Sequence, residues 1–266
     1  MRTILNIKWY ILGIFATLMF TSCLSDSDSF VQGTGTGYVT TSEGSKYLAF
    51  PFGYFSANGV QNLQTGSYYL VDYRIEDLNP VKNVYPGQIL SIYKNKPLEE
   101  SYLKVEEVPA EDAVSVRGIT PMDRTNGREL ADGWTFYFLP KEGAKKVLEA
   151  YFYYDVENQI DKDDKDVSTE SNKVIIDVKF EESSQELDAT ELGKLQIVVA
   201  KFGELRNTFE ADFSESKPDN DGNKFANVAI QFRFDGQDGD KAQTKYVGGW
   251  DSNNSQNYFY MTFTEE

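Results

Sequence analysis

The fold class is decided by Ser67-Tyr68-Tyr69-Leu70-Val71-Asp72-Tyr73-Arg74-Ile75-Glu76. Its odd positions from Tyr69 to Ile75 are apolar, whereas Asp72, Arg74 and Glu76 lie between them. Alternation of this kind has the period of a β-strand with one buried face and one solvated face. Gln64-Thr65-Gly66 before it and Tyr85-Pro86-Gly87 after it are turn formers, so the strand has defined ends.

Four more short strands are expected around this segment, within residues 37–110. They are Tyr38 to Thr41, Lys46 to Phe55, Gln88 to Tyr93 and Tyr102 to Val108. Five strands in so short a stretch predict a small OB-like barrel or a meander as the N-terminal domain.

A polar, proline-led stretch at residues 109–112 is the expected domain boundary. Residues 113–266 then contain seven expected strands, of which Lys173 to Phe180 and Phe225 to Phe234 alternate most regularly. The other five are Trp134 to Leu139, Leu195 to Phe202, Thr208 to Phe213, Lys245 to Trp250 and Tyr258 to Phe263. The sequence therefore predicts an all-β protein whose C-terminal domain is an antiparallel β-sandwich.

One segment of this domain, Gly143 to Tyr154, carries two conflicting signals. Its first apolar residues have helical spacing, but it ends in the aromatic run Tyr151-Phe152-Tyr153-Tyr154, which favours a strand. We expect one short helix that leads into a strand.

The N-terminus has the pattern of a bacterial lipoprotein signal peptide. Arg2 and Lys8 precede an apolar run from Trp9 to Phe20, and the small residues Thr21 and Ser22 lead to Cys23. An uncleaved membrane helix is the alternative, but about a dozen apolar residues fall short of the roughly 20 that a bilayer requires. We expect residues 1–22 to be removed and Cys23, the only cysteine, to carry the lipid.

Residues 23–36 are rich in Ser, Asp, Gly and Thr and predict a flexible acidic tether. The acidic serines after Cys23 are similar to the export tag of surface lipoproteins, and a solubilising linker is the alternative. The alternating glycines Gly33, Gly35 and Gly37 lack the Lys-Ser/Thr ending of a phosphate-binding loop, so they are assigned to the linker as well. An outer-membrane, cell-surface location is expected, with the periplasmic face as the other option.

Charge and composition exclude several functions. Removal of residues 1–22 leaves 26 − 2 = 24 basic against 42 acidic residues, a formal charge of −18, which disfavours nucleic acid as a partner. The chain has no histidine, so Ser-His-Asp catalysis and the common zinc sites are excluded. Carboxylate pairs could still serve glycoside hydrolysis, but no hydrolase pattern surrounds them. We expect a protein that is not an enzyme and needs no cofactor.

Two acidic loops are considered as ion sites. Asp219, Asp221 and Asn223 alternate around a glycine and offer the hard oxygen ligands that calcium prefers, whereas a solvated hairpin loop is the simpler alternative. The interspersed lysines between Asp161 and Asp166 predict a solvated charged loop.

Three aromatic residues of the second domain are candidates for ligand binding: Trp134, Trp250 and Tyr258. Trp134 alternates with Phe136 and Phe138, which favours a core position instead. Trp250 follows two glycines and precedes a polar loop, so a ligand could reach it, although local packing is the alternative.

The layout resembles that of the NigD-like lipoproteins. It shares the Phe-Thr-Ser-Cys signal ending, the acidic serine tether, the Gly37-Tyr38-Val39 start of a small β domain and a longer second β domain. The resemblance implies an OB-like domain followed by a β-sandwich, with no established activity and no binding motif to transfer. The segment from Tyr151 to Asn172 departs from the family layout.

The function expected from the sequence is binding of a macromolecular partner by a surface lipoprotein that is not an enzyme, with protein preferred to glycan. A carbohydrate-binding lipoprotein of a glycan-uptake system is the alternative. An exposed line of aromatic side chains on a sheet face or loop edge would favour the glycan.

Overall fold

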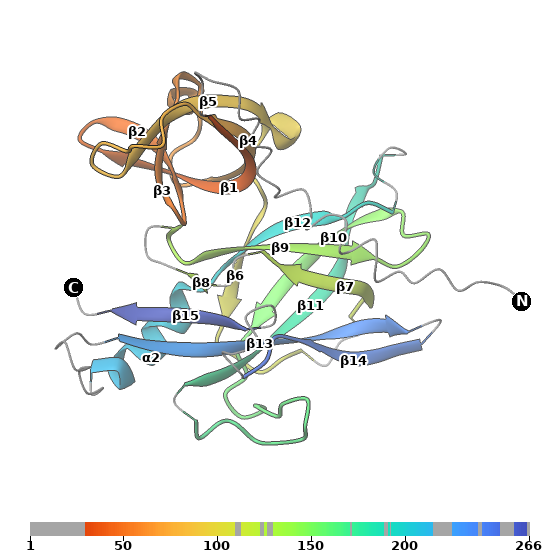
Figure 1. The fold of residues 1–266 in the computed structure, drawn as a ribbon. Coiled ribbons are helices and arrows are strands. Elements are labelled where there is room, and N and C mark those ends of the chain that lie inside the picture. The colour runs from red at the N-terminus through yellow and green to blue at the C-terminus, as the bar shows by residue number, and fades with distance from the viewer. Residues whose placement is uncertain are drawn as a thin grey trace, which may run out of the picture. The chain divides into compact units, whose positions relative to one another are not determined.

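The computed structural model describes residues 30–109, 113–122, 125–126, 130–170, 172–188, 191, 193–214, 225–238, 241–250 and 258–264. The chain divides into two compact units, residues 1–97 and residues 98–266. Both units are built from strands, and α2 is the one α-helix among the described residues (Figure 1). The all-β class is therefore confirmed.

The first unit is a closed five-stranded barrel with the order β1-β2-β3-β5-β4. β1 pairs antiparallel with both β2 and β4, and β3 runs parallel to β5, which closes an OB-like barrel. The elements are β1 (Val31–Ser42), β2 (Ser45–Phe50), β3 (Gly53–Ser56), η2 (Asn58–Asn62), β4 (Tyr68–Ile75), β5 (Val84–Ile92) and η3 (Tyr93–Asn95). The single strand expected from Lys46 to Phe55 is thus two strands joined by a tight turn.

The expected tether is wrong from residue 31 onward, because Val31 to Thr36 belong to β1. The odd residues of β1 up to Val39 face the barrel interior, and three of them are the glycines assigned to the linker. A Cβ at Gly37 would lie 2.8 Å from the Leu48 side chain, and one at Gly33 would lie 2.8 Å from the Tyr73 hydroxyl. The glycines therefore leave room for large side chains of neighbouring strands to cover β1.

Gly37→Val is expected to destabilise the first unit by about 1–3 kcal/mol, because the added methyl groups overpack the barrel core. Gly35→Ala is the matched control, since a Cβ there meets Phe50 at 3.5 Å, an ordinary contact. Chemical denaturation of the two variants measures the difference. Equal stability of both variants would show that β1 does not need its glycines.

The second unit contains one mixed sheet and one α-helix. Its strands are β6 (Glu100–Lys104), β7 (Val116–Pro121), β8 (Thr125–Asn126), β9 (Gly133–Pro140), β10 (Lys146–Tyr153), β11 (Lys173–Glu186), β12 (Gln196–Lys201), β13 (Phe225–Asp238), β14 (Lys241–Val247) and β15 (Phe259–Thr264), and its helix is α2 (Gly203–Ser214). The sheet runs in the order β11-β10-β6-β12-β9-β7-β13-β15-β8, with β14 paired to β13.

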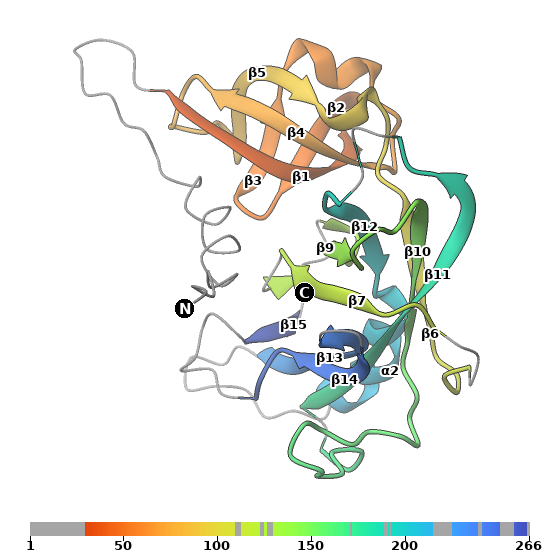
Figure 2. The same ribbon diagram turned by 90° about the vertical axis from the view of Figure 1, so that its right-hand side faces the viewer.

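This sheet differs from the expected antiparallel sandwich in two ways. First, β6 runs parallel to both of its neighbours, β10 and β12, and β11 runs parallel to β13. Second, the pairing of β11 with β13 joins one end of the sheet to its middle, so that seven strands close into a barrel (Figure 2). The barrel encloses an aromatic core around Trp134, Phe136, Phe202 and Phe232, each at most 2% exposed.

Two element predictions in this unit are wrong. Thr208 to Phe213, expected as a strand, lies in α2, where Leu205 and Phe209 are buried four residues apart on one helix face. Gly143 to Tyr154 contains strand β10 and no helix. There, pairing with β11 and β6 outweighs the helical spacing of the first residues.

The domain boundary expected at residues 109–112 also lies too late in the chain. β6, expected as the last strand of the first domain, pairs with β10 and β12 in the second unit. The two units separate between Pro97 and Leu98 instead. A strand's partners, and not the polar stretch behind it, decide the unit to which it belongs.

A fragment of residues 98–266 is expected to fold, whereas a fragment of residues 113–266 is expected to lose cooperative unfolding. The shorter fragment lacks β6, the strand that joins β10 to β12. Circular dichroism and thermal melts of the two fragments provide the test. A cooperative melt of residues 113–266 at an unchanged temperature would contradict the assignment of β6.

Candidate functional site

A group of tyrosines lies on the outer side of β6 and β10. Leu103 and Phe152 are register partners, and both point into the core. The residues that flank them, Tyr102, Lys104, Tyr151 and Tyr153, therefore point outward, because side chains alternate along a strand. We call these four residues, together with Glu149 beside them on β10, the tyrosine face.

Four side chains of the tyrosine face contact one another: Lys104, Tyr151, Tyr153 and Glu149. The Lys104 ammonium lies 5.3 Å from the ring centre of Tyr151 and 5.0 Å from that of Tyr153, and it donates to the Tyr153 hydroxyl at 3.4 Å. Tyr153 is buried by its neighbours at 3% exposure, whereas the Tyr102 residue is 67% exposed. Tyr102 is thus the ring of this face that is most open to a ligand.

A hydrogen bond within the tyrosine face raises the pKa of Tyr151. The Tyr151 hydroxyl donates to a Glu149 carboxylate oxygen at 2.6 Å, and this bond, with smaller contributions from burial and nearby charge, raises the pKa of Tyr151 to about 12. Tyr151 therefore stays protonated in neutral solution and holds the Glu149 carboxylate in place. The face presents ring surfaces edged by fixed oxygen atoms and an ammonium group.

An ion pair lies next to Tyr102, whose register partner on β12 is Lys201. Lys201 Nζ is 3.9 Å from a Glu100 carboxylate oxygen. Burial raises the pKa of Glu100 and lowers that of Lys201, and the opposite charge of each partner counters the shift of the other. The Glu100–Lys201 pair therefore lies beside Tyr102 on the β12 side of the sheet.

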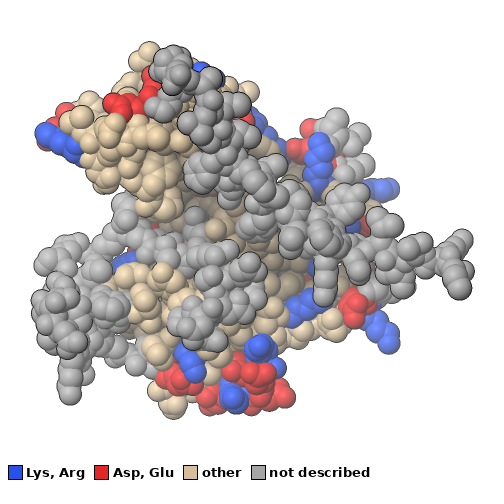
Figure 3. Space-filling model, in the orientation of Figure 1, with Lys and Arg blue, Asp and Glu red and all other residues tan. Residues whose placement is uncertain are grey.

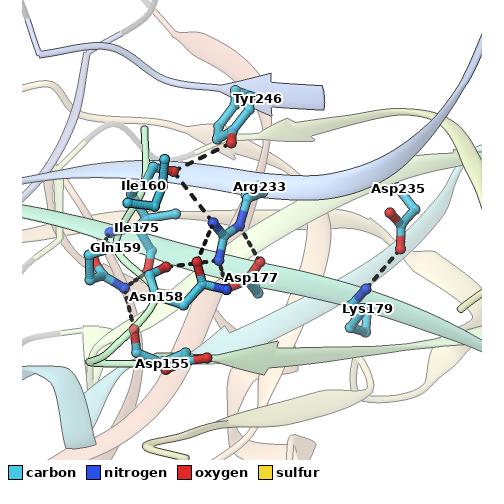
Figure 4. A network of polar contacts seen from close by, with 10 residues as sticks. All are labelled: Asp155, Asn158, Gln159, Ile160, Ile175, Asp177, Lys179, Arg233, Asp235 and Tyr246. Carbon is cyan, nitrogen blue, oxygen red and sulfur yellow. Dashed lines mark hydrogen bonds and ion pairs between the residues drawn. The ribbon is translucent and has the colours of Figure 1, made fainter. Parts of the chain in front are cut away.

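A polar network covers the outer surface where β11 meets β13 (Figure 4). Arg233 donates to both carboxylate oxygens of Asp177, at 2.6 and 2.8 Å, and its remaining N–H groups reach the main-chain oxygens of Asn158 and Ile160. Burial raises the pKa of Asp177, and the Arg233 guanidinium opposes that rise. These contacts attach the segment after β10 to the β11–β13 pair.

Gln159 extends the same network into the sheet. Its amide nitrogen donates to the main-chain oxygens of Asp155 and Ile175, and its amide oxygen accepts from the Ile175 N–H at 2.7 Å. The side chain thereby replaces the strand partner that β11 lacks beyond the end of β10. Gln159 is 2% exposed, and its amide nitrogen and oxygen both bond to main-chain groups. Its side chain is therefore not a candidate for ligand contact.

Trp250 and Asp161 make a pair that the sequence did not suggest. The Trp250 indole N–H donates to the Asp161 carboxylate at 3.0 Å, and Lys173 Nζ lies 5.6 Å from the centre of the indole ring. Asp161 also accepts from the main-chain N–H groups of Asp163 and Lys165 and is only 2% exposed. These contacts agree with the local-packing interpretation of Trp250. The prediction that residues 161–166 form a solvated loop is wrong for Asp161, which is buried.

The rest of this loop carries its charges outward. Figure 3 shows acidic and basic side chains mixed at the lower edge of the second unit, where Figure 1 draws the segment between β10 and β11. Desolvation opposes ionisation of Asp161, but its hydrogen-bond donors and the Lys165 charge outweigh this effect and lower its pKa. Because the folded-state pKa lies below the unfolded value of about 3.9, the loop contact is retained above about pH 4 and lost in more acid solution.

Asp161→Asn is expected to speed amide exchange at residues 163 and 165, because the carboxylate that accepts from both N–H groups is replaced by a neutral amide. Asp163→Asn, the same change at an exposed position of this loop, is the matched control. Hydrogen exchange with residue resolution distinguishes them. Unchanged protection in Asp161→Asn would rule out the carboxylate as the organiser of the loop.

The other two predicted ligand-binding aromatics have different environments. Trp134 is fully buried against Phe202, Phe232 and Phe259, so its prediction as a ligand platform is corrected to core packing. Its indole nitrogen has no acceptor among the described residues. Tyr258 is partly exposed and its ring centre is 5.0 Å from that of Tyr260, while burial raises its pKa.

Several predicted sites lie outside the described residues: the lipidation site Cys23 and the calcium candidates Asp219, Asp221 and Asn223. Within the described part of the chain, no group of three or more carboxylates is placed to hold a metal ion. A search of the same residues finds no helix with the length and apolar character needed to cross a membrane.

The comparisons with known proteins give similarity of fold. An uncharacterised protein from Parabacteroides merdae matches with a TM-score of 0.61 at 10% identity, covering 88% of this chain and all of that protein. A candidate lipoprotein from Bacteroides fragilis matches with a TM-score of 0.53 at 7% identity, covering 81% of this chain and 96% of that one. No family model matches the sequence, and neither does any curated protein.

The tyrosine face was missed at the sequence level although one signal for it was present. Tyr102 and Lys104 alternate with Leu103 in a segment correctly expected to be a strand. The sequence predicts this strand in the first domain, whereas it pairs with β10 and β12 in the second unit. The nonlocal pairing of β6 with β10 creates the site.

Proposed function

We propose that this protein is a lipid-anchored binding protein without enzymatic activity, displayed on the outer membrane and related to the NigD-like lipoproteins. The observation that carries the binding role is the exposed Tyr102 ring on the same outer sheet face as Tyr151 and Lys104. The cell-surface side of the membrane is part of the proposal, and so is the NigD-like relationship. The fold similarity to a candidate lipoprotein of Bacteroides fragilis supports the anchor.

The tyrosine face favours a glycan over a protein as the partner. Tyrosine rings accept the apolar faces of sugar rings, while their hydroxyls and the adjacent carboxylate and ammonium offer hydrogen bonds to sugar hydroxyls. Lys104 has Glu106 at 3.8 Å, and Glu149 accepts from Tyr151, so the face provides no unbalanced positive charge for an anionic ligand. A neutral glycan is the ligand class that fits.

The proposal of binding without turnover rests on the roles of the charged groups near this face. Glu100 is paired with Lys201, and the Glu149 carboxylate is held by Tyr151. Glycoside hydrolysis needs a protonated acid and an ionised partner on opposite sides of one glycosidic bond. Glu100 is largely buried in its ion pair, which supports a recognition role for the surface instead.

Tyr102→Ala is expected to weaken binding of a neutral glycan by tenfold or more, since an engaged aromatic residue contributes upward of about 1.4 kcal/mol. Tyr102→Phe keeps the ring and should retain most of the affinity. Calorimetry on ligands selected from a glycan array, with protein lacking its lipid, measures both variants.

Val156→Ala is the control for a change at another exposed apolar position of this unit, where Val156 is 51% exposed. All three variants should melt at the wild-type temperature, because neither residue is part of the core. Glycan affinity that is equal in Tyr102→Ala and wild type would remove the tyrosine face as the site. Turnover of the bound glycan, abolished by Glu149→Gln, would replace binding with catalysis.

A further inference from the structure

The first described strand begins closer to the expected lipid than the sequence suggested. Phe30 is seven positions after Cys23, and β1 starts at Val31. A fully extended chain spans at most about 3.6 Å per residue, so this segment reaches no farther than roughly 25 Å. With the proposed lipid on Cys23, the start of β1 would therefore be confined to the neighbourhood of the bilayer.

Exposed apolar side chains of the first unit gather around the start of β1. Five large hydrophobic residues described in this unit are exposed, and four of them lie on segments that border that point: Phe30, Phe52, Leu78 and Val81, with 46%, 37%, 47% and 76% exposure. Val31 pairs with Ile75, the last residue of β4, so the β4–β5 loop that carries Leu78 and Val81 begins there. The fifth, Leu90, lies within β5.

Ring contacts place Phe52 at the same point of the barrel. Its ring stacks on Phe50 with centres 5.0 Å apart and meets Tyr73 at 5.9 Å. Tyr73 is the register partner of Gly33 and covers it. Phe30 is on the neighbouring outer surface, where the Arg74 guanidinium lies 4.6 Å above its ring.

Basic side chains accompany the acidic ones in this region. Arg74 and Lys82 lie with Glu76 and Asp77 on the end of β4 and the following loop, and Lys82 also approaches Glu43 at 3.9 Å. Exposed aromatic and aliphatic side chains beside basic groups suit the headgroup boundary of a membrane, where aromatic residues are enriched.

We infer that this end of the first unit docks on the bilayer, with Phe52, Leu78 and Phe30 in contact with the boundary between headgroups and acyl chains. The inference rests on the proposed lipid anchor at Cys23. The acyl chains on Cys23 would hold the protein at the membrane, and apolar contact from the first unit would add to that binding. The docked end would orient the first unit as well as tether it.

The test uses introduced cysteines, because the single native cysteine is consumed by the lipid. Leu78→Cys and Leu90→Cys are a matched pair, since both leucines are 47% exposed in the same unit. Each full-length lipoprotein is labelled with an environment-sensitive dye and reconstituted into vesicles of phosphatidylethanolamine and phosphatidylglycerol that contain a brominated lipid. The dye at residue 78 is expected to be quenched several times more strongly than the dye at residue 90.

Flotation of the same vesicles separates the possible failures. Protein that does not float with the vesicles overturns the anchor and this inference together. Protein that floats with equal quenching at both positions, or with none, overturns the inference alone and leaves a protein partner as the occupant of this surface. Phe30→Ser combined with Phe52→Ser should reduce quenching at residue 78 while flotation is unchanged, and quenching that survives this double change also counts against docking.

Discussion

The ion pair between Asp177 and Arg233 is the interaction on which the second unit most depends. It joins β11 to β13, the parallel pair that turns a long mixed sheet into a closed barrel. Parallel neighbours are connected by long segments of chain, so their register needs a specific contact. Loss of one buried partner leaves an unpaired charge at a cost of about 3–5 kcal/mol, whereas an apolar pair of similar volume is often neutral. The ion pair thus specifies register more than it adds stability.

The same arginine organises what lies above the sheet. After Asp177 takes two of its donors, the others reach Asn158 and Ile160, which fixes the segment that follows β10. Asp161, next along the chain, can then accept from Trp250. A segment that departs from the NigD-like layout is in this way attached to the barrel by satisfied polar groups. The buried polar side chains of this segment, Gln159 and Asp161, are occupied by these internal contacts, so they give no support to a binding role for the segment.

The sequence was sufficient wherever the period of a strand is local. Alternation in β4, β11 and β13 predicted these strands and their buried faces, and the all-β class followed from them. It was insufficient where the partner decides the outcome. A glycine-rich stretch has the same composition in a flexible linker as in a strand covered by large side chains such as Tyr73. Only the packing of β4 and β2 against β1 shows that these glycines belong to a strand. Likewise, the period of β6 showed a strand but not whether its neighbours would lie in the first unit or the second.

Two kinds of exposed aromatic surface remain, and their chemistry differs. Around the start of β1 the exposed rings are phenylalanines with aliphatic neighbours, which have no hydroxyl to keep wet and gain by leaving water for hydrocarbon. On β6 and β10 the rings are tyrosines whose neighbours are a carboxylate and an ammonium, so that surface would lose hydrogen bonds in a bilayer. A solvated ligand with both apolar and hydroxyl surface matches the tyrosine face. It does not match the apolar surface around the start of β1. The residue types therefore support the proposed membrane contact for the first unit and the proposed glycan contact for the second.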